Sequence, residues 1–288
     1  MDTARRANPL EQLARAYQRA VPDQVADDGL FGPRSIAWRV NRDRCFPLAG
    51  MRSLMIQALH PLAMAGVAQH STWKQDPFGR LAATSSYLLT TTYGDTASAM
   101  QAAAWVRKIH TRVRGVDLET GLPYSAEDPA LLLWVHAGMV DSIIEVVQRY
   151  GRPLGEGDAD RYVAEMVRFA EIVGVPRQDV PATVEALRRY IESVDLRHAT
   201  PAAREAMAIV LDPPDLDEEL RELWSELGQV AIGTLPDWAR EMYGFAVPPA
   251  DVMEREPVRQ LLGALDLAFE SLPGVLEARE RIELRMRA

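Results

Sequence analysis

Apolar residues recur every three or four positions along most of this chain, and no segment sustains strict alternation of apolar and polar residues. The first spacing places apolar side chains on one face of an α-helix, whereas the second is typical of a strand. The pattern therefore predicts an all-α protein, and the charged end of the chain, 283–288, is expected to fray. The expected helices cover 1–25, a short segment after 33, 52–69, 77–93, 95–115, 129–150, 158–173, 182–194, 201–210, 217–234, 236–243 and 258–272.

The clearest helix boundaries lie between residues 76 and 115. Asp76 can cap a helix whose first position is Pro77, because proline has no N–H to leave unpaired there. Gly94 ends this helix, and a second begins after Asp95 and is expected to continue to about residue 115. Four basic residues near the expected end of the second helix would complement the helix dipole.

The second of these helices carries one apolar stripe that includes a histidine. Its members, at spacings of four and three, are Ala99, Ala103, Val106, His110 and Val113. His110 is the ionisable member, with Arg107 and Arg114 at the margins of the same face.

On the preceding helix, Arg80 and Thr84 are four residues apart and share a face, so both can reach an anion beside His110. An imidazole in an apolar wall with small alanines, rimmed by arginines, suits a haem, whose iron takes the nitrogen and whose propionates take the guanidiniums. A hydrogen-bonded core histidine is nevertheless the commoner explanation of such a pattern.

Three other histidines are open to two interpretations each. His60 precedes Pro61, where a kink is expected, and either faces a pocket or caps the break. His70 is either a cation at the end of that segment or a second pocket residue. His136 either adds a polar group to a pocket or, as we favour, donates a core hydrogen bond to a carbonyl. Trp105 and Trp134 are either walls for a macrocycle or ordinary core residues.

Composition favours one acidic globular domain. The 288 residues are 48% hydrophobic and 25% charged, with a net charge of −9, which argues against nucleic acid as a partner. We divide the chain into an N-terminal helical extension, 1–26, and a helical domain, 27–288. The extension is expected either to pack over the core or to contact a second copy in a homodimer.

Cysteine content and the termini bear on location. Cys45 is the single cysteine, which fits a reducing compartment and excludes a disulfide framework. The N-terminal residues lack the apolar core of a secretory signal, and no uninterrupted apolar run is long enough for a membrane span, the nearest being 50–68. The sequence therefore predicts a cytoplasmic protein without a membrane span.

Several common chemistries have no motif here. The sequence contains no G-x-x-x-x-G-K-[ST] phosphate loop, no G-x-G-x-x-G after a strand, no H-E-x-x-H zinc motif and no G-x-S-x-G nucleophile elbow. No glutamate is followed three residues later by histidine, which argues against a carboxylate di-iron bundle.

Four motifs in one order give a more specific indication. They read SLMIQALHPLAMAGVAQHS, DPFGRLAATSS, IHTRVRG and YSAEDPALLLWVHAGMVDS. Together they resemble the catalytic domain shared by the bacterial rubber oxygenases (latex-clearing proteins) and the MpaB-type oxygenases, over about residues 30 to 245. The resemblance implies a globin-like helical core with extra helices that holds one haem b, with His110 as the proximal iron ligand. It also implies that Arg80 and Thr84 lie beside the haem and are needed for catalysis.

The remaining candidates come from their positions along the chain. Arg107 or Arg114 is expected to join Arg80 in pairing with the propionates, and His60 and His136 are further cofactor-binding candidates. The rubber oxygenases carry a lysine immediately before the threonine, where this chain has Ala83. That change removes a candidate distal ligand and argues against polyisoprene itself as the substrate, while leaving haem binding unaffected.

The function that the sequence predicts is a haem-dependent oxygenase that acts with O2 on a hydrophobic small molecule, such as an isoprenoid or another alkene. Two alternatives remain open at this stage. One is a haem-binding carrier or sensor without turnover, and the other is a haem-free helical module that binds lipid.

Overall fold

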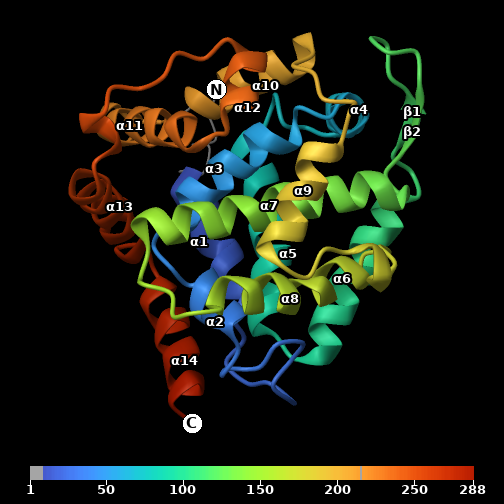
Figure 1. The fold of residues 1–288 in the computed structure, drawn as a ribbon. Helices are drawn as coiled ribbons and strands as arrows, with labels where there is room; N and C mark the ends of the chain where they lie inside the picture. Colours follow the sequence, from blue (N-terminus) through green and yellow to red (C-terminus); the bar gives the residue numbers. More distant parts are fainter. Residues whose placement is uncertain (1–8, 215) are drawn as a thin grey trace, which may run out of the picture.

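The computed structural model describes residues 9–214 and 216–288, and within them the chain forms fourteen α-helices and one two-stranded sheet (Figure 1). The all-α prediction is confirmed. The helices are α1 (Pro9–Ala20), α2 (Ile36–Asn41), α3 (Phe46–Gln57), α4 (Pro61–His70), α5 (Pro77–Tyr93), α6 (Thr96–His110), α7 (Pro129–Tyr150), α8 (Asp158–Glu171), α9 (Val184–Ser193), α10 (Pro201–Leu211), α11 (Glu218–Thr234), α12 (Asp237–Tyr243), α13 (Arg255–Glu270) and α14 (Val275–Arg287). Two short 3-10 turns, Arg177–Asp179 and Asp251–Met253, and the strands β1 (Arg114–Val116) and β2 (Pro123–Ser125) complete the described chain.

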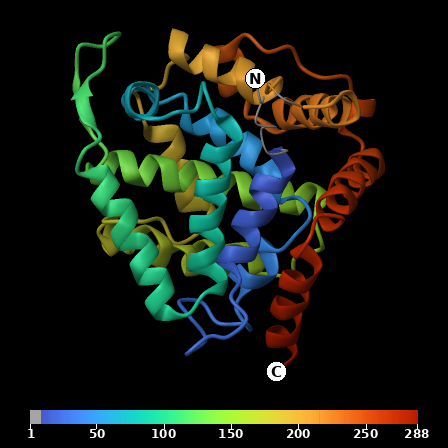
Figure 2. The ribbon, with the colours of Figure 1, turned by 180° about the vertical axis from the view of Figure 1, so that it is seen from behind.

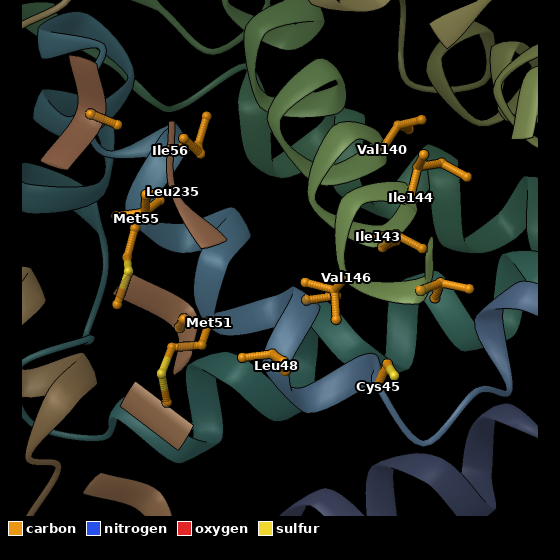
Figure 3. Close-up of a cluster of buried hydrophobic side chains, with 14 of the residues drawn as sticks. Cys45, Leu48, Met51, Met55, Ile56, Val140, Ile143, Ile144, Val146 and Leu235 are labelled. Atoms are coloured by element: carbon orange, nitrogen blue, oxygen red, sulfur yellow. The ribbon is translucent and has the colours of Figure 1, made fainter. Parts of the chain in front are cut away.

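The centre of the molecule is the contact between α3 and α7. Figure 3 shows their apolar side chains meeting, with Leu48 and Met55 from α3 and Ile144 from α7 all fully buried. Gly138 allows the close approach, because a Cβ there would lie 3.1 Å from Cγ2 of Ile56. Burial of each such side chain contributes about 1.5–3 kcal/mol. This pair fixes the frame on which the other helices pack.

The expected break at His60 and Pro61 is confirmed. α3 ends at Gln57, and α4 begins at Pro61 with His60 as its extended N-cap residue. The His60 side chain makes no capping hydrogen bond, so the change of direction comes from the proline backbone.

α7 is enclosed on most of its circumference. It has 22 residues and contains an 18-residue window with a mean hydropathy of 1.7, long and apolar enough to cross a membrane, but 72% of that window is buried inside the protein. Within α7, Val135 is 39% exposed, whereas Trp134 and Ala137 are fully buried, so this surrounded helix has no single apolar face.

The N-terminal helix packs on the helical body. Ala14, Ala16 and Ala20 of α1 are buried, and the helix lies against α5 and α14. Residues 1–8 of the helix predicted over 1–25 lie outside the described residues. The division of the chain at residue 26 and the homodimer contact stay predictions.

The C-terminal segment forms a helix where fraying was expected. Val275, Ala278 and Ile282 of α14 are buried, at spacings of three and four. Arg285 stacks over the Trp38 ring at 4.5 Å and donates a 2.5 Å hydrogen bond to the carbonyl of Tyr93. The prediction was wrong because these tertiary contacts outweigh the polarity of the segment.

The helix predicted over 95–115 ends early. α6 ends at His110, and residues 114–116 instead form β1, which pairs antiparallel with β2. Gly115 faces Tyr124 across this pair, and a Cβ at residue 115 would lie 2.8 Å from the tyrosine hydroxyl. Strands of three residues are too short to show a period of two, so the sequence pattern did not reveal them.

Candidate functional site

The helix pair α5 and α6 carries the central candidate residues, and both helices begin at the predicted N-caps. Asp76 accepts from the Gly79 N–H at 2.9 Å at the start of α5, and Asp95 accepts from the Ser98 N–H at 2.8 Å at the start of α6. The two helices meet at the Gly94 turn, where Ala99 and Ala103 are fully buried. Figure 2 shows them diverging from that turn, so the start of α5 and the end of α6 stand apart.

Arg80 lies on the first turns of α5 and is tied to Thr84. Its guanidinium Nη1 donates to Thr84 Oγ1, as their spacing predicted. Arg80, Ala83 and Thr84 all have exposed side chains, yet burial lowers the pKa of Arg80. The guanidinium is therefore partly desolvated by the surrounding protein, although solvent reaches the side chain.

His110 is at the open end of α6 and is half-buried. Its Nδ1 is buried and has no hydrogen-bond partner among the described residues. Burial lowers the pKa of His110, the positive charge of Arg80 lowers it further, and Glu127 opposes both. The imidazole is therefore neutral at pH 7 and available as a nitrogen ligand.

The other two arginines are placed differently from the expectation. Arg107 of α6 donates through Nη1 to the carbonyl of Ile172, just after α8, and its charge acts on Tyr87. Arg114 is exposed on β1, so it does not continue the helical face of His110 as the spacing had suggested. Whether either arginine holds a propionate stays a prediction.

His136 belongs to a chain of rings between α5, α7 and α8. Its ring stacks on that of Phe169, with 6.1 Å between the ring centroids, and the Phe169 and Tyr87 ring centroids lie 5.2 Å apart. Burial lowers the pKa of His136 to about 4. Neither His136 Nδ1 nor the buried Tyr87 hydroxyl has a partner within the described part of the chain. The expected hydrogen bond from His136 to a core carbonyl is therefore wrong.

Tyr87 and Phe169 were not among the site residues predicted from the sequence. Tyr87 follows Arg80 by seven residues and Thr84 by three, so it shares their helix face and could have been found. Phe169 comes from a distant helix, and no local signal pointed to it.

His60 contacts the opposite side of α7. Its ring lies 5.8 Å from that of Trp134, two residues before His136 and so about 160° away around the helix. Burial lowers the pKa of His60, and its Nδ1 also lacks a partner among the residues described. His60 and His136 therefore face different neighbours, and a role for both beside one cofactor stays a prediction.

His70 and the two tryptophans are less suited to the site. His70 is exposed, with its Nε2 lying 3.1 Å from the Tyr124 hydroxyl of the hairpin. Trp105 is 61% exposed on the side of α6 away from Ala103. Trp134 is fully buried and donates through Nε1 to the carbonyl of Gln57 at 3.0 Å.

The donor set fits a haem better than a bare metal ion. No group of three or more His, Cys, Asp or Glu side chains suited to a metal ion occurs in the described ranges 9–214 and 216–288. A haem needs only one axial side chain, because the porphyrin supplies four nitrogens. His110, neutral and without a protein partner, meets that need, with the cation of Arg80 nearby.

A separate open hollow of about 590 Å³ lies between the end of α7 and the starts of α8 and α9. Arg188 and Arg255 line it, but Arg188 pairs with Glu145 at 2.9 Å and Arg255 donates to the carbonyl of Gly151 at 3.4 Å. Its cations are already engaged, so the hollow offers less chemistry than the α5–α6 site.

Comparisons with known proteins agree with the motifs. A model of the catalytic domain described as "ER-bound oxygenase mpaB/B'/Rubber oxygenase" matches residues 38–266. The solved structure of latex clearing protein LCP in the closed state superposes with a TM-score of 0.57 at 16% identity, covering 100% of this chain and 76% of that one. A search of curated proteins found no match. The similarity in structure shows a shared fold, and the match over most of the chain shows that this protein belongs to the mpaB/rubber oxygenase catalytic-domain family.

Proposed function

We propose that this protein is a haem b-dependent oxygenase that acts with O2 on an apolar small molecule containing a C=C bond. The observation that carries the proposal is the state of His110. Burial and the charge of Arg80 lower its pKa and so keep the imidazole neutral at pH 7, its Nδ1 has no partner among the described residues, and it is the last residue of α6. Membership of an oxygenase family supports the same chemistry.

The residues have distinct roles in this proposal. His110 would hold the iron through a ring nitrogen, and Arg80 would neutralise a propionate. A bound haem b would supply an iron centre that activates O2. Thr84, which accepts from Arg80, would fix the orientation of the guanidinium. Arg107 and Arg114 are the further propionate candidates, and Arg107 would have to leave the Ile172 carbonyl to act as one.

We base the substrate class, an isoprenoid or another alkene, on the family to which the chain belongs. Ala83 and Thr84 are exposed on α5, and on the same helix Tyr87 meets the Phe169 ring at 5.2 Å between centroids, so small and apolar side chains are present on and beside α5. Polyisoprene is disfavoured because Ala83 stands where the rubber oxygenases have lysine.

An absorption spectrum of the purified protein, with a pyridine haemochrome assay, tests the cofactor. A Soret band with one haem b per chain is expected, followed by O2 consumption when a soluble alkene is added. Haem without turnover of any alkene would indicate a carrier or sensor instead. A protein that stays colourless after haem is added back would indicate a haem-free binding module.

The ligand assignment is tested by His110→Ala. This change should abolish tight haem retention while leaving the helical far-UV signal unchanged, because the ring makes no hydrogen bond that the fold needs. His70→Ala is the matched control, since His70 is exposed and contacts only the hairpin tyrosine. A His110→Ala protein with the wild-type ligation spectrum would defeat the assignment.

A further inference from the structure

Exposed apolar side chains are concentrated on one short part of the chain. Six of the eleven large apolar side chains that are exposed within the described residues fall between 100 and 122. They are Met100 at 42%, Trp105 at 61% and Ile109 at 43% on α6, and Val116 at 51%, Leu118 at 90% and Leu122 at 45% on the hairpin. We call this surface the α6–hairpin edge. Figures 1 and 2 both show α6 and the hairpin following one another along one side of the molecule.

The exposed apolar side chains of α6 point away from the rest of the protein. Trp105 and Ile109 are four residues apart and share a face. Ala99 and Ala103, on the other side of the helix, are fully buried against α5. The exposed face is thus the one that no other described element covers.

The hairpin holds its apolar tip in a fixed shape. Asp117 accepts from Thr120 through both the N–H, at 2.9 Å, and the hydroxyl, at 2.6 Å, and so closes the turn. Tyr124 anchors the base by donating to Gln69 at 2.8 Å. Leu118 is therefore presented to solvent by a structured turn, although exposed turn positions usually carry polar residues.

The charge of this edge is opposite to that of the chain. No aspartate or glutamate occurs from 96 to 116, although the whole chain has a net charge of −9. This segment carries four cations, of which Lys108, Arg112 and Arg114 make no ion pair with any described residue. The turn adds two acids, Asp117 and Glu119, so residues 100–122 carry four cations and two anions, a net charge of +2.

We propose that the α6–hairpin edge docks on an anionic lipid surface, with Trp105, Ile109 and Leu118 entering the interface and Lys108 and Arg112 contacting the headgroups. Tryptophan favours the lipid–water interface, and exposed cations beside apolar side chains bind anionic lipid additively. The charge pattern favours this partner over a second copy of the chain. Although the net charge of the chain is negative, the same edge of a second copy would be equally basic and would repel this one. This inference goes beyond the proposed function and does not depend on haem.

Co-flotation of the purified full chain with phosphatidylcholine vesicles, with and without phosphatidylglycerol, tests the proposal. Binding is expected at low salt and mainly to the anionic vesicles. Leu118→Asp should lower the partition coefficient about tenfold or more, because an apolar insertion is lost. Lys108→Glu with Arg112→Glu should lower it by at least about fivefold for each cation removed, on anionic vesicles only.

Matched controls separate docking from folding. Leu267→Asp on α13 replaces another strongly exposed leucine, 69% accessible, and should bind as the wild type does. Vesicles should shift the tryptophan emission to the blue, and Trp105→Phe should remove the shift, because Trp105 is the one exposed tryptophan among the described residues. The other five, Trp38, Trp73, Trp134, Trp224 and Trp238, are buried or half-buried and lie outside this edge. Far-UV spectra should be unchanged in all variants.

Three results would overturn the proposal. One is no binding to either vesicle at low salt, and another is binding that Leu118→Asp leaves unchanged. The third is a dimer, measured by light scattering, that Leu118→Asp dissociates while vesicle binding is absent, which would show that a second copy covers this edge. The haem spectrum does not depend on lipid binding, so the proposed oxygenase function is tested separately.

Discussion

Buried polar groups have hydrogen-bond partners on one face of α7 and lack them, among the described residues, on the other. Towards α3, Arg52 donates to Asp141 Oδ2 at 2.8 Å, to Ser142 Oγ at 2.8 Å and to the carbonyl of Thr234 at 3.0 Å. Towards α8, His136 and the nearby Tyr87 hydroxyl have no partner among the described residues. Positions 136 and 141 are about 140° apart on the helix.

The contrast separates structure from function. A buried polar group without a partner costs about 1–3 kcal/mol, so folding alone disfavours the α8 side. The α3 side is satisfied within the protein and needs nothing more. His110 at the end of α6 resembles the α8 side, since its Nδ1 is also buried and unpaired in the described part of the chain. Of the unpaired groups, we expect His110, His136 and Tyr87 to gain a partner from a ligand.

The largest effect is expected from Arg52→Ala. This change leaves the Asp141 carboxylate buried without its main partner and should lower the free energy of unfolding by about 3–5 kcal/mol. Urea unfolding followed by far-UV circular dichroism measures it. Arg188→Ala is the control: its guanidinium also pairs with Asp141, at 3.5 Å, but is 45% exposed, so the loss should stay below about 1 kcal/mol. Equal losses of unfolding free energy in the two variants would show that the buried ion pair stabilises the protein no more than the exposed one.

A smaller, pH-dependent effect is expected from His136. Its pKa is about 4 in the folded protein, against the ordinary 6.5, so the unfolded chain binds a proton more readily. Stability should therefore be complete above pH 6.5 and fall between pH 6.5 and 4, losing about 3 kcal/mol through this group.

His136→Phe should remove that share of the pH dependence and change stability little at pH 7. His60 and His110, whose pKa values burial also lowers, leave a residual slope in both proteins. The measurement is urea unfolding of the haem-free protein at several pH values. A slope that His136→Phe does not reduce would mean that His136 finds a partner when it is charged.

Local signals revealed the helices, and long-range contacts decided the rest. Asp76 and Asp95 both cap the helices that they were expected to cap, because capping depends on three or four neighbouring residues. The partners of Arg52 could not be predicted, since Thr234 is 182 residues away. The early end of α6 could not be predicted for a similar reason, because β1 forms only by pairing with β2.

For the site, the sequence placed Arg80, Thr84 and His110 on two adjacent helices, and the structure brings Arg80 close enough to act on the His110 pKa. It could not show that Arg107 turns to Ile172, because α8 is brought there by packing. Nor could it show that His136 lacks a partner. The absence of a hydrogen bond is a property of the whole fold, and no motif encodes it.

The smallest effect, and the sharpest test of the contrast, is expected from Tyr87→Phe. In the haem-free protein this change removes a buried hydroxyl that has no partner in the described residues, so stability should stay equal or rise by up to about 1 kcal/mol. Tyr243→Phe is the matched control, because its hydroxyl donates to the Met55 carbonyl at 2.7 Å, and its loss should cost about 1 kcal/mol. If Tyr87 is kept for a ligand, the order reverses on loading: haem or substrate should stabilise the wild type more than Tyr87→Phe in thermal unfolding. An equal gain for both proteins would mean that the hydroxyl faces neither, and that the α8 side of α7 is imperfectly packed core rather than part of the site.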